Sequence, residues 1–183
     1  MVDFPVEGAC PWAVRPWYVL TVKPQHEKAV AQQLRARAVE EYLPLYPAKR
    51  RWCDRVAIVL LPLFPRYVFC RFTFEDRLKA LQIVSVTSIV SFGGKPCPVP
   101  NQEIEAIRAM ISSGRPIRPW PCVRIGERVR ICTGPLEGLE GVLAREKSGL
   151  RVVVNMDLLN RAVAVEVDSD MVRGVSADAA ARG

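Results

Sequence analysis

The sequence predicts an α+β fold in two parts: an antiparallel sheet with flanking helices, joined by a linker to a small β-barrel. Residues 17–113 alternate strand-like and helix-like segments, and residues 124–173 carry only strand signals. Residues 114–123 contain three prolines and a glycine without periodicity, which indicates a semi-stiff linker. The flanking residues 1–16 and 174–183 show no periodic pattern, so we expect a flexible arm and a disordered tail.

Composition indicates a globular protein that can bury a sizeable core. The chain has 183 residues, of which 50% are hydrophobic and 25% are charged. No apolar run reaches the length of a membrane span, and the first residues lack the pattern of a secretory signal. The six cysteines include no CxxC pair and the chain has one histidine, which argues against a zinc site and for reduced thiols. We therefore expect a cytoplasmic monomer with no membrane, metal or cofactor.

No residue pattern predicts catalysis. His26 lies near the start of a predicted helix, as a surface residue would. The acidic pairs Glu40-Glu41 and Glu75-Asp76 flank helices and fit solvated faces, and no cysteine has a histidine at a telling spacing. We therefore expect a binding protein with no catalytic residues rather than an enzyme.

Periodicity predicts the elements of the N-terminal part. Residues 17–22 are aromatic and β-branched, which favours a strand. Residues 25–39 place Val30, Leu34 and Ala38 at four-residue steps among good helix formers, which is typical of an amphipathic helix. The same reasoning predicts strands at 41–47, 56–61, 67–72 and 87–92, and helices at 75–83 and 102–112, the last capped by Asn101.

The stretch 129–143 (VRICTGPLEGLEGVL) defines the C-terminal part. Apolar and polar residues alternate at its start as in a strand, and Gly134, Gly138 and Gly141 then indicate a tight loop before the next strand. A generic β-hairpin would give the same pattern. The further strands expected to close a barrel are the valine-rich runs 150–155 and 162–167, and Met171-Val172.

Basic residues gather in one segment of the N-terminal part. Between Pro44 and Arg71 the chain carries six basic side chains against Asp54 alone. Such a patch is the electrostatic footprint of a phosphate backbone. A solvated loop kept soluble by its charge fits the same sequence. The candidates for a nucleic-acid contact are Lys49, Arg50, Arg51 and Arg55, in a stretch expected to turn the chain between two strands.

Four stretches, in this order, carry a family resemblance: Trp17-Tyr18-Val19, residues 62–69 (PLFPRYVF), residues 90–94 (VSFGG) and residues 129–143. They resemble the NusG family of transcription factors, and the last resembles its KOW motif. The resemblance implies a NusG N-terminal-type domain at 17–113 and an SH3-like KOW β-barrel at 124–173. Chain length and the Leu-Phe-Pro-x-Tyr form are similar to the specialised RfaH-like branch of the family.

The resemblance implies a transcription elongation or antitermination factor. In this family the N-terminal domain binds the clamp helices of the largest RNA polymerase subunit through an apolar pocket and suppresses pausing or termination. By analogy, the basic cluster contacts non-template or upstream DNA. The alternative is that Phe64 and Tyr67 are ordinary core residues. The residues assigned to polymerase binding are Tyr18, Phe64, Pro65, Arg66, Tyr67 and Phe92, with Arg66 where the general factor usually has glycine.

The resemblance also implies that the KOW domain recruits a partner. In the general factor this partner is ribosomal protein S10 (uS10) or termination factor Rho. Residues 167–171 lack the aromatic side chain that the family typically carries there, which argues against Rho binding. Met156, Leu158 and Leu159 are the candidates for an apolar partner surface, and the alternative is that they cap the barrel.

Other function classes explain less of the sequence. A KOW-type RNA-binding or ribosome-associated protein without polymerase binding would explain the barrel and the charge, but not a separate α+β domain with an aromatic signature. A structural scaffold that binds no nucleic acid is the other alternative.

The C-terminal domain of RfaH can adopt a helical hairpin, and the valines here argue against that state. Six valines lie between residues 152 and 167, and β-branched side chains lose rotamer freedom in a helix. We therefore predict a β-barrel at rest.

Overall fold

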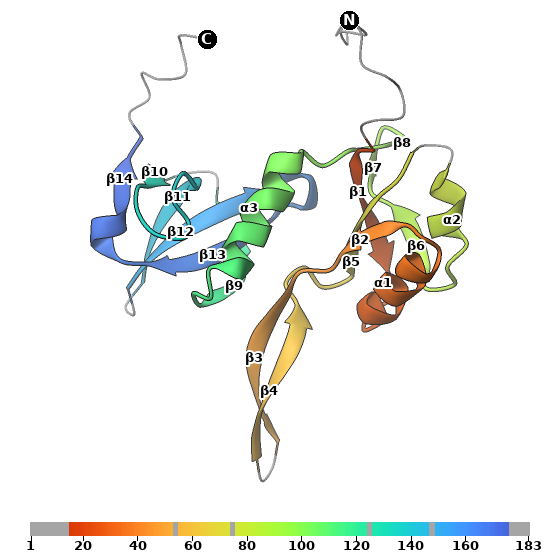
Figure 1. The fold of residues 1–183 in the computed structure, drawn as a ribbon, viewed down its shortest axis with the longest axis horizontal. Helices are drawn as coiled ribbons and strands as arrows, with labels where there is room; N and C mark the ends of the chain where they lie inside the picture. Colours follow the sequence, from red (N-terminus) through yellow and green to blue (C-terminus); the bar gives the residue numbers. More distant parts are fainter. Residues whose placement is uncertain (1–14, 53–54, 74–75, 124–125, 147–148, 176–183) are drawn as a thin grey trace, which may run out of the picture.

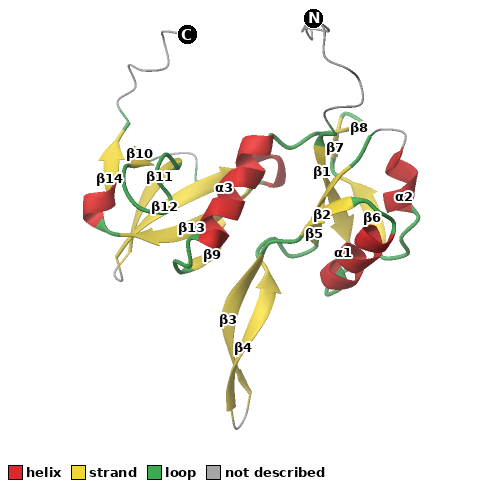
Figure 2. Ribbon diagram, in the orientation of Figure 1, coloured by secondary structure: helices red, strands yellow, loops and turns green. Residues whose placement is uncertain are grey.

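Figure 1 shows an N-terminal α+β unit and a C-terminal β domain side by side, with helix α3 (Asn101–Ser112) between them and a long hairpin projecting away from both. Figure 2 shows that strands outweigh the short helices in both parts. The predicted N-terminal arm (1–16) and tail (174–183) lie almost entirely outside the described residues. The structure, a computed structural model, describes residues 15–52, 55–73, 76–123, 126–146 and 149–175.

The N-terminal unit is a four-stranded antiparallel sheet. Its strands follow the order β2-β5-β1-β6, and the central pair places Val19 opposite Phe69. Successive residues of a strand face opposite sides, so Tyr18 and Leu20 pack with α1 and α2 while Trp17 and Val19 face the other side. The bounds are β1 Trp17–Val22, β2 Glu40–Tyr42, β5 Tyr67–Arg71, β6 Val86–Ile89, α1 Glu27–Ala36 and α2 Arg77–Leu81; the short strands β7 Ser91–Phe92 and β8 Lys95–Pro96 pair separately.

The hairpin consists of β3 (Leu45–Trp52) and β4 (Arg55–Pro62), which form a separate two-stranded sheet. The sequence predicts that the basic stretch 49–55 turns the chain, and the chain does reverse within it, between Trp52 and Arg55. The turn is shorter than expected. Lys49, Arg50 and Arg51 lie within β3. Both faces of the ribbon near these residues are open to water, so long charged side chains are accommodated in a strand there.

The C-terminal domain is a six-stranded antiparallel sheet in the order β14-β10-β11-β12-β13-β9. Gly141 in β11 must be glycine, because a Cβ atom would lie 2.5 Å from the carbonyl oxygen of Val153. Gly138, in the preceding loop, has a φ of +87°, which glycine tolerates best. The bounds are β9 Ile117–Pro121, β10 Arg128–Ile131, β11 Glu140–Glu146, β12 Gly149–Met156, β13 Arg161–Val167 and β14 Val172–Gly174.

One continuous hydrophobic cluster, here called the shared core, joins the two parts of the molecule. α3 contributes Ile104, Ile107 and Met110, which lie on one face of the helix at three-residue steps. Fully burying a side chain of this size contributes roughly 1.5–3 kcal/mol. The three side chains of α3 therefore strongly stabilise the packing of the helix into the shared core. The other buried members are Trp17, Val19, Leu63, Phe64, Phe69 and Val99 from the N-terminal side, and Val129, Ile131, Leu136, Val152, Met156, Leu159, Val163, Val165, Val167 and Met171 from the C-terminal side.

The predicted fold class, an antiparallel α+β unit followed by a C-terminal β domain, is confirmed. The β state of the C-terminal domain is also confirmed, since the valine-rich segments form β12 and β13. The segment predicted as a linker contains β9, which pairs with β13 from Ile117 to Pro121. β9 is the outer strand of its sheet, where proline is tolerated.

Two local predictions are wrong at helix starts. Asn101 does not cap α3: Pro100 occupies the cap position and the Asn101 side chain accepts a hydrogen bond from Trp17 instead. α1 begins at Glu27 rather than at residue 25, because Gln25 has a φ of +65° and lies in the turn after β1. Tertiary contacts and turn geometry override the local pattern at both places.

Candidate functional site

The turn between β4 and β5 carries the aromatic residues that the family resemblance assigns to polymerase binding. Leu63 and Phe64 are buried, with exposed fractions of 1% and 2%. Phe64 packs edge-on against Phe69, with ring centroids 5.6 Å apart. Tyr67 is half-buried against the same cluster, and Pro65 is exposed. The turn therefore presents one polar and one apolar side, and its apolar side lies inside the shared core.

Arg66 gives this turn its shape. Its φ is +72°, in the left-handed region where a side chain is strained and glycine is favoured. The backbone N–H of Arg66 donates to Glu27 Oε1 at 2.8 Å, and Glu27 is buried at the start of α1. This bond satisfies the amide and fixes the turn to α1. The left-handed φ of Arg66 is the physical reason why glycine is expected at this position.

The C-terminal domain lies directly beside the same turn. Leu63 and Pro65 line a groove whose opposite wall is formed by residues of β9 and β13. Trp120 and Ala162 belong to that wall. The apolar side of the turn is therefore covered by the C-terminal domain in this arrangement.

Tyr18 and Phe92 do not join Phe64. Tyr18 stacks on Phe72, with centroids 4.7 Å apart, on the face of the sheet that carries α1 and α2. Its burial raises the pKa of the phenol. Phe92 is 85% exposed on β7 and belongs neither to the shared core nor to the cluster that packs under α1 and α2. The structure thus brings together Phe64, Pro65, Arg66 and Tyr67, and separates Tyr18 and Phe92 from them.

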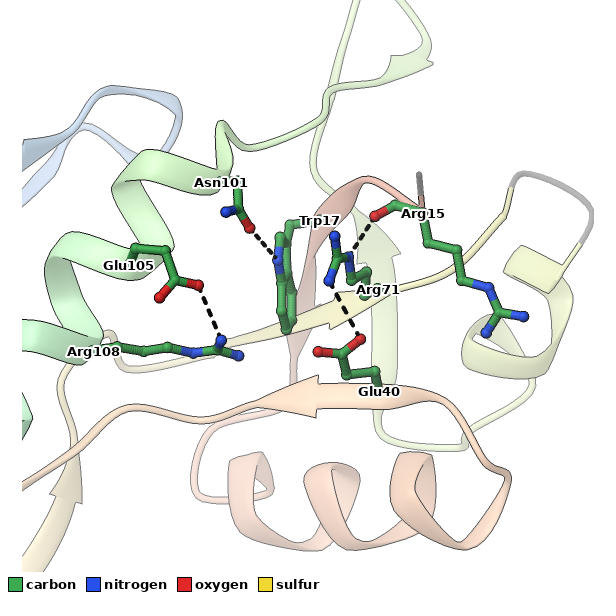
Figure 3. Close-up of polar contacts among 7 residues, drawn as sticks. All are labelled: Arg15, Trp17, Glu40, Arg71, Asn101, Glu105 and Arg108. Atoms are coloured by element: carbon green, nitrogen blue, oxygen red, sulfur yellow. Dashed lines mark hydrogen bonds and ion pairs between the residues drawn. The ribbon is translucent and has the colours of Figure 1, made fainter. Parts of the chain in front are cut away.

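Trp17 anchors α3 to the N-terminal sheet. Its indole N–H donates to Asn101 Oδ1 at 3.2 Å, and the guanidinium of Arg108 lies 5.3 Å from the ring centroid. Figure 3 shows the indole between these α3 residues on one side and Arg71 of β5 on the other. Arg71 lies 5.6 Å from the indole and donates to the carbonyl oxygen of Arg15. The cation–π contact of Arg108 and the hydrogen bond to Asn101 hold α3 against the sheet, and Ile104, Ile107 and Met110 of the same helix enter the shared core.

Burial keeps two groups of the N-terminal sheet neutral, the half-buried Tyr42 on one face and the buried Cys70 on the other. Burial raises the pKa of Tyr42 to about 12, with Arg108 opposing the rise, and the ring lies 5.0 Å from that guanidinium. Burial also raises the pKa of the Cys70 thiol, so this cysteine is an inert core residue rather than a nucleophile.

The hairpin displays the predicted basic cluster. Lys49, Arg50 and Arg51 are exposed on β3. The side chain of Arg55 lies outside the described residues. On the opposite strand Val56, Ile58 and Leu60 are 63%, 70% and 51% exposed. Sequence reasoning missed this feature because the continuous apolar run 56–61 resembles a buried strand. The exposed apolar residues are, besides the charge, a second feature of this hairpin that is typical of a binding surface.

The candidates for a partner surface on the C-terminal domain are mostly covered. Met156 and Leu159 are 1% and 7% exposed and belong to the shared core, and Leu158 is half-buried against it. In this arrangement they form packing contacts, as the alternative interpretation of the sequence expects, rather than an open apolar surface.

An acidic pair faces across the boundary between α3 and the C-terminal domain. Glu103 lies in the first turn of α3, and its Oε2 is buried without a hydrogen-bond partner among the described residues. Burial, together with the negative charge of Asp157 after β12, raises the pKa of the Glu103 carboxyl to about 7. Sequence reasoning missed this pair because its two members are far apart in the chain.

The described part of the chain contains no group of three His, Cys, Asp or Glu side chains that could hold a metal ion. No helix within the described ranges is both long and apolar enough to cross a membrane.

Fold and site together define a protein with an N-terminal α+β unit, which carries an aromatic turn and a basic hairpin, and a C-terminal β domain. A family model described as NusG, transcription termination factor nusG, matches residues 15–108, more than half of the 183-residue chain. The chain therefore belongs to the NusG family.

Curated relatives and a solved structure agree with this assignment. The transcription termination/antitermination protein NusG of Lactococcus lactis subsp. lactis (strain IL1403) is 28% identical over 178 residues, covering 88% of this chain and 94% of that protein. Its counterpart from Borreliella burgdorferi is 24% identical over 183 residues, covering 84% and 95%. The structure described as "Domain interaction in Thermotoga maritima NusG" matches with a TM-score of 0.55 and 23% identity, covering 88% of this chain and 98% of that one. The similarity to the Thermotoga maritima structure is a similarity of fold.

Proposed function

We propose that this chain is a transcription elongation and antitermination factor that binds RNA polymerase through its N-terminal domain and recruits a partner through its C-terminal domain. The match of residues 15–108 to the NusG family carries the proposal. The relatives from Lactococcus lactis and Borreliella burgdorferi are named as transcription termination/antitermination proteins, which supports it. Bound to polymerase, the factor suppresses pausing or termination.

The polymerase contact is assigned to the turn formed by Phe64, Pro65, Arg66 and Tyr67, which would receive the clamp helices of the largest subunit. An apolar aromatic cluster that accepts a partner helix is a common mode of recognition. Because Phe64 lies in the shared core, this contact requires the C-terminal domain to move away from the turn. Separation would also uncover Met156 and Leu159 for a partner such as ribosomal protein S10 (uS10).

The hairpin is assigned to nucleic acid. Lys49, Arg50 and Arg51 project from an element that stands apart from both domains, so phosphates can approach them without a steric barrier. On a polymerase-bound factor the accessible nucleic acid is upstream or non-template DNA.

A pull-down of core RNA polymerase with the tagged full-length protein tests the polymerase contact. We expect the Phe64→Leu/Tyr67→Ala double variant to lose about 2 kcal/mol of binding or more, roughly 30-fold, as for hot-spot aromatics. Leucine keeps most of the volume that the core needs at position 64. Tyr18→Phe, on the opposite face of the sheet, is the control and should bind like the parent.

Undiminished binding by a double variant with native circular dichroism would contradict the assigned contact. Failure of the parent protein itself to bind polymerase, with retained binding to RNA or ribosomes, would favour the alternative of a KOW-type RNA-binding or ribosome-associated protein.

A further inference from the structure

One face of the β3–β4 ribbon combines charge and apolar surface in a way that phosphate binding alone does not explain. In the ladder, Lys49 is opposite Ile58 and Arg51 is opposite Val56. Directly opposite residues lie on the same face of an antiparallel pair. This face therefore carries cations along β3 and aliphatic side chains along β4, with Pro47 opposite Leu60 at its base.

The face is open to solvent along its length. Val56, Ile58 and Leu60 are 63%, 70% and 51% exposed, and Lys49 and Arg51 are exposed as well. Within the described ranges, neither Lys49 nor Arg51 forms an ion pair. Figure 1 shows the ribbon standing clear of both domains. Three neighbouring aliphatic side chains held in water by an isolated ribbon indicate a surface that a ligand covers.

We propose that this face is a track for single-stranded DNA, in which Lys49 and Arg51 hold phosphates and Val56, Ile58 and Leu60 cover unstacked bases. The inference deepens the proposed function, on which it rests for the choice of DNA as the ligand. It adds to the basic contact an apolar half and a preference for single strands.

The arrangement of charge favours a single strand over a duplex. A single strand presents phosphates along one side and base faces along the other, which matches cations on β3 and aliphatic side chains on β4. A duplex groove is bounded by phosphates on both walls, and its outer surface would leave the aliphatic residues in water.

The spacing of the aliphatic side chains leads to the same conclusion. Val56, Ile58 and Leu60 are two residues apart, which corresponds to roughly 6.8 Å along a strand. Stacked bases of a duplex rise about 3.4 Å per nucleotide. Bases that contact successive aliphatic residues must therefore be separated from one another, as they are in an unstacked strand whose faces rest on apolar side chains.

Fluorescence anisotropy with the full-length protein tests the proposal without polymerase. The probes are a labelled 12-nucleotide single-stranded DNA, the duplex of the same sequence and the corresponding RNA. We expect the parent to prefer the single strand to the duplex, and the Val56→Ser/Ile58→Ser/Leu60→Ser variant to bind the single strand about tenfold more weakly with an unchanged salt slope. Lys49→Ala/Arg51→Ala should reduce the salt slope by about 1.4, from two lost phosphates at roughly 0.7 each.

Val84→Ser is the matched control, because Val84 is 85% exposed and lies elsewhere in the N-terminal unit; it should bind like the parent. Equal single-strand affinity of the triple variant and the parent would overturn the proposal, as would tighter binding of the parent to the duplex. A tenfold preference for RNA would overturn the assignment to DNA, since this face has no hydroxyl or amide side chain to read a 2′-hydroxyl. Loss of polymerase binding in the triple variant with unchanged DNA binding would make the face a protein contact and overturn it too.

Discussion

We predict that Glu103 makes the association of α3 with the C-terminal domain dependent on pH. The carboxyl has a pKa of about 7 instead of 4.5, first because it is buried and second because Asp157 lies nearby. A raised pKa means that the native arrangement favours the protonated acid. Its stabilising contribution is therefore fully present below pH 4.5 and is lost as the pH rises through 7.

The magnitude follows from the size of the shift. A rise from 4.5 to about 7 corresponds to roughly 3 kcal/mol at 1.36 kcal/mol per unit. Glu103 is only half-buried, so water screens much of this, and the positive end of the α3 dipole opposes the rise. We therefore expect a loss of about 1 kcal/mol between pH 5 and pH 8.

Charged residues from the adjoining elements also face this boundary. Glu105 of α3, Arg128 of β10, Glu137 of the following loop and Glu140 of β11 line the groove beside Glu103. Since their charges remain in a Glu103 variant, the difference between parent and variant isolates the one carboxyl.

Urea denaturation of the parent and Glu103→Gln at pH 5, 6, 7 and 8 measures this difference. The variant should lack the loss of about 1 kcal/mol, and hydrogen exchange in α3 should be slower in the variant than in the parent at pH 8. Glu105→Gln removes an exposed charge from the same helix and should keep the parent's pH dependence. If Glu103→Gln loses as much stability as the parent between pH 5 and pH 8, the reasoning about this carboxyl is refuted.

Three further changes test the packing described above. Glu27→Ala should cost about 1–3 kcal/mol in urea denaturation because the Arg66 amide loses its acceptor, whereas Glu27→Gln keeps an oxygen there and should cost less; equal costs would contradict the hydrogen bond. Arg66→Gly should stabilise the protein by roughly 0.5–1 kcal/mol by relieving the left-handed backbone, and a destabilised variant would show that the arginine side chain outweighs the strain. Gly141→Ala should cost about 2 kcal/mol or more, seen as a lower Tm, while Gly174→Ala, whose Cβ would meet a flexible Glu127 side chain at 3.3 Å, should be tolerated; similar Tm values for the two would contradict the close approach of β11 to β12.

The elements that local sequence determines were predictable. The aromatic and β-branched residues of β1, which is buried on both faces, favour a strand, and Val30 and Leu34 mark the buried face of α1. The predicted step to Ala38 is wrong, because α1 ends at Ala36 and Ala38 is exposed with a φ of +56°. The valines of β12 and β13 favour a sheet in any context. The residues of the turn at Phe64 were also identifiable, through the family resemblance. The place of Arg66 where glycine is usual matches its left-handed backbone.

What sequence alone did not predict depends on contacts between distant parts of the chain. Phe64 has the same local pattern whether it faces a partner or the interior, and its burial against Phe69 in the shared core, beside the groove between the turn and β9 and β13, arises only in the folded chain. Asn101 would fit a helix cap, but the indole of Trp17 competes for its side chain. The electrostatic effect of Asp157 on the pKa of Glu103 likewise arises only when α3 packs against the C-terminal domain.

Strand β9 also limits how far the two domains can travel from each other. The carbonyl of Pro116 already accepts from Glu166, and the pairing continues to Pro121, so four peptide steps separate the end of α3 at Ser112 from a fixed point on the C-terminal domain. These steps span at most about 14 Å. If β9 detaches from β13 up to Cys122, the tether grows to about 35 Å. A longer tether lowers the effective concentration of the detached domain at its former site. Whether β9 stays paired with β13 therefore determines both how far the C-terminal domain can move and how readily it docks again.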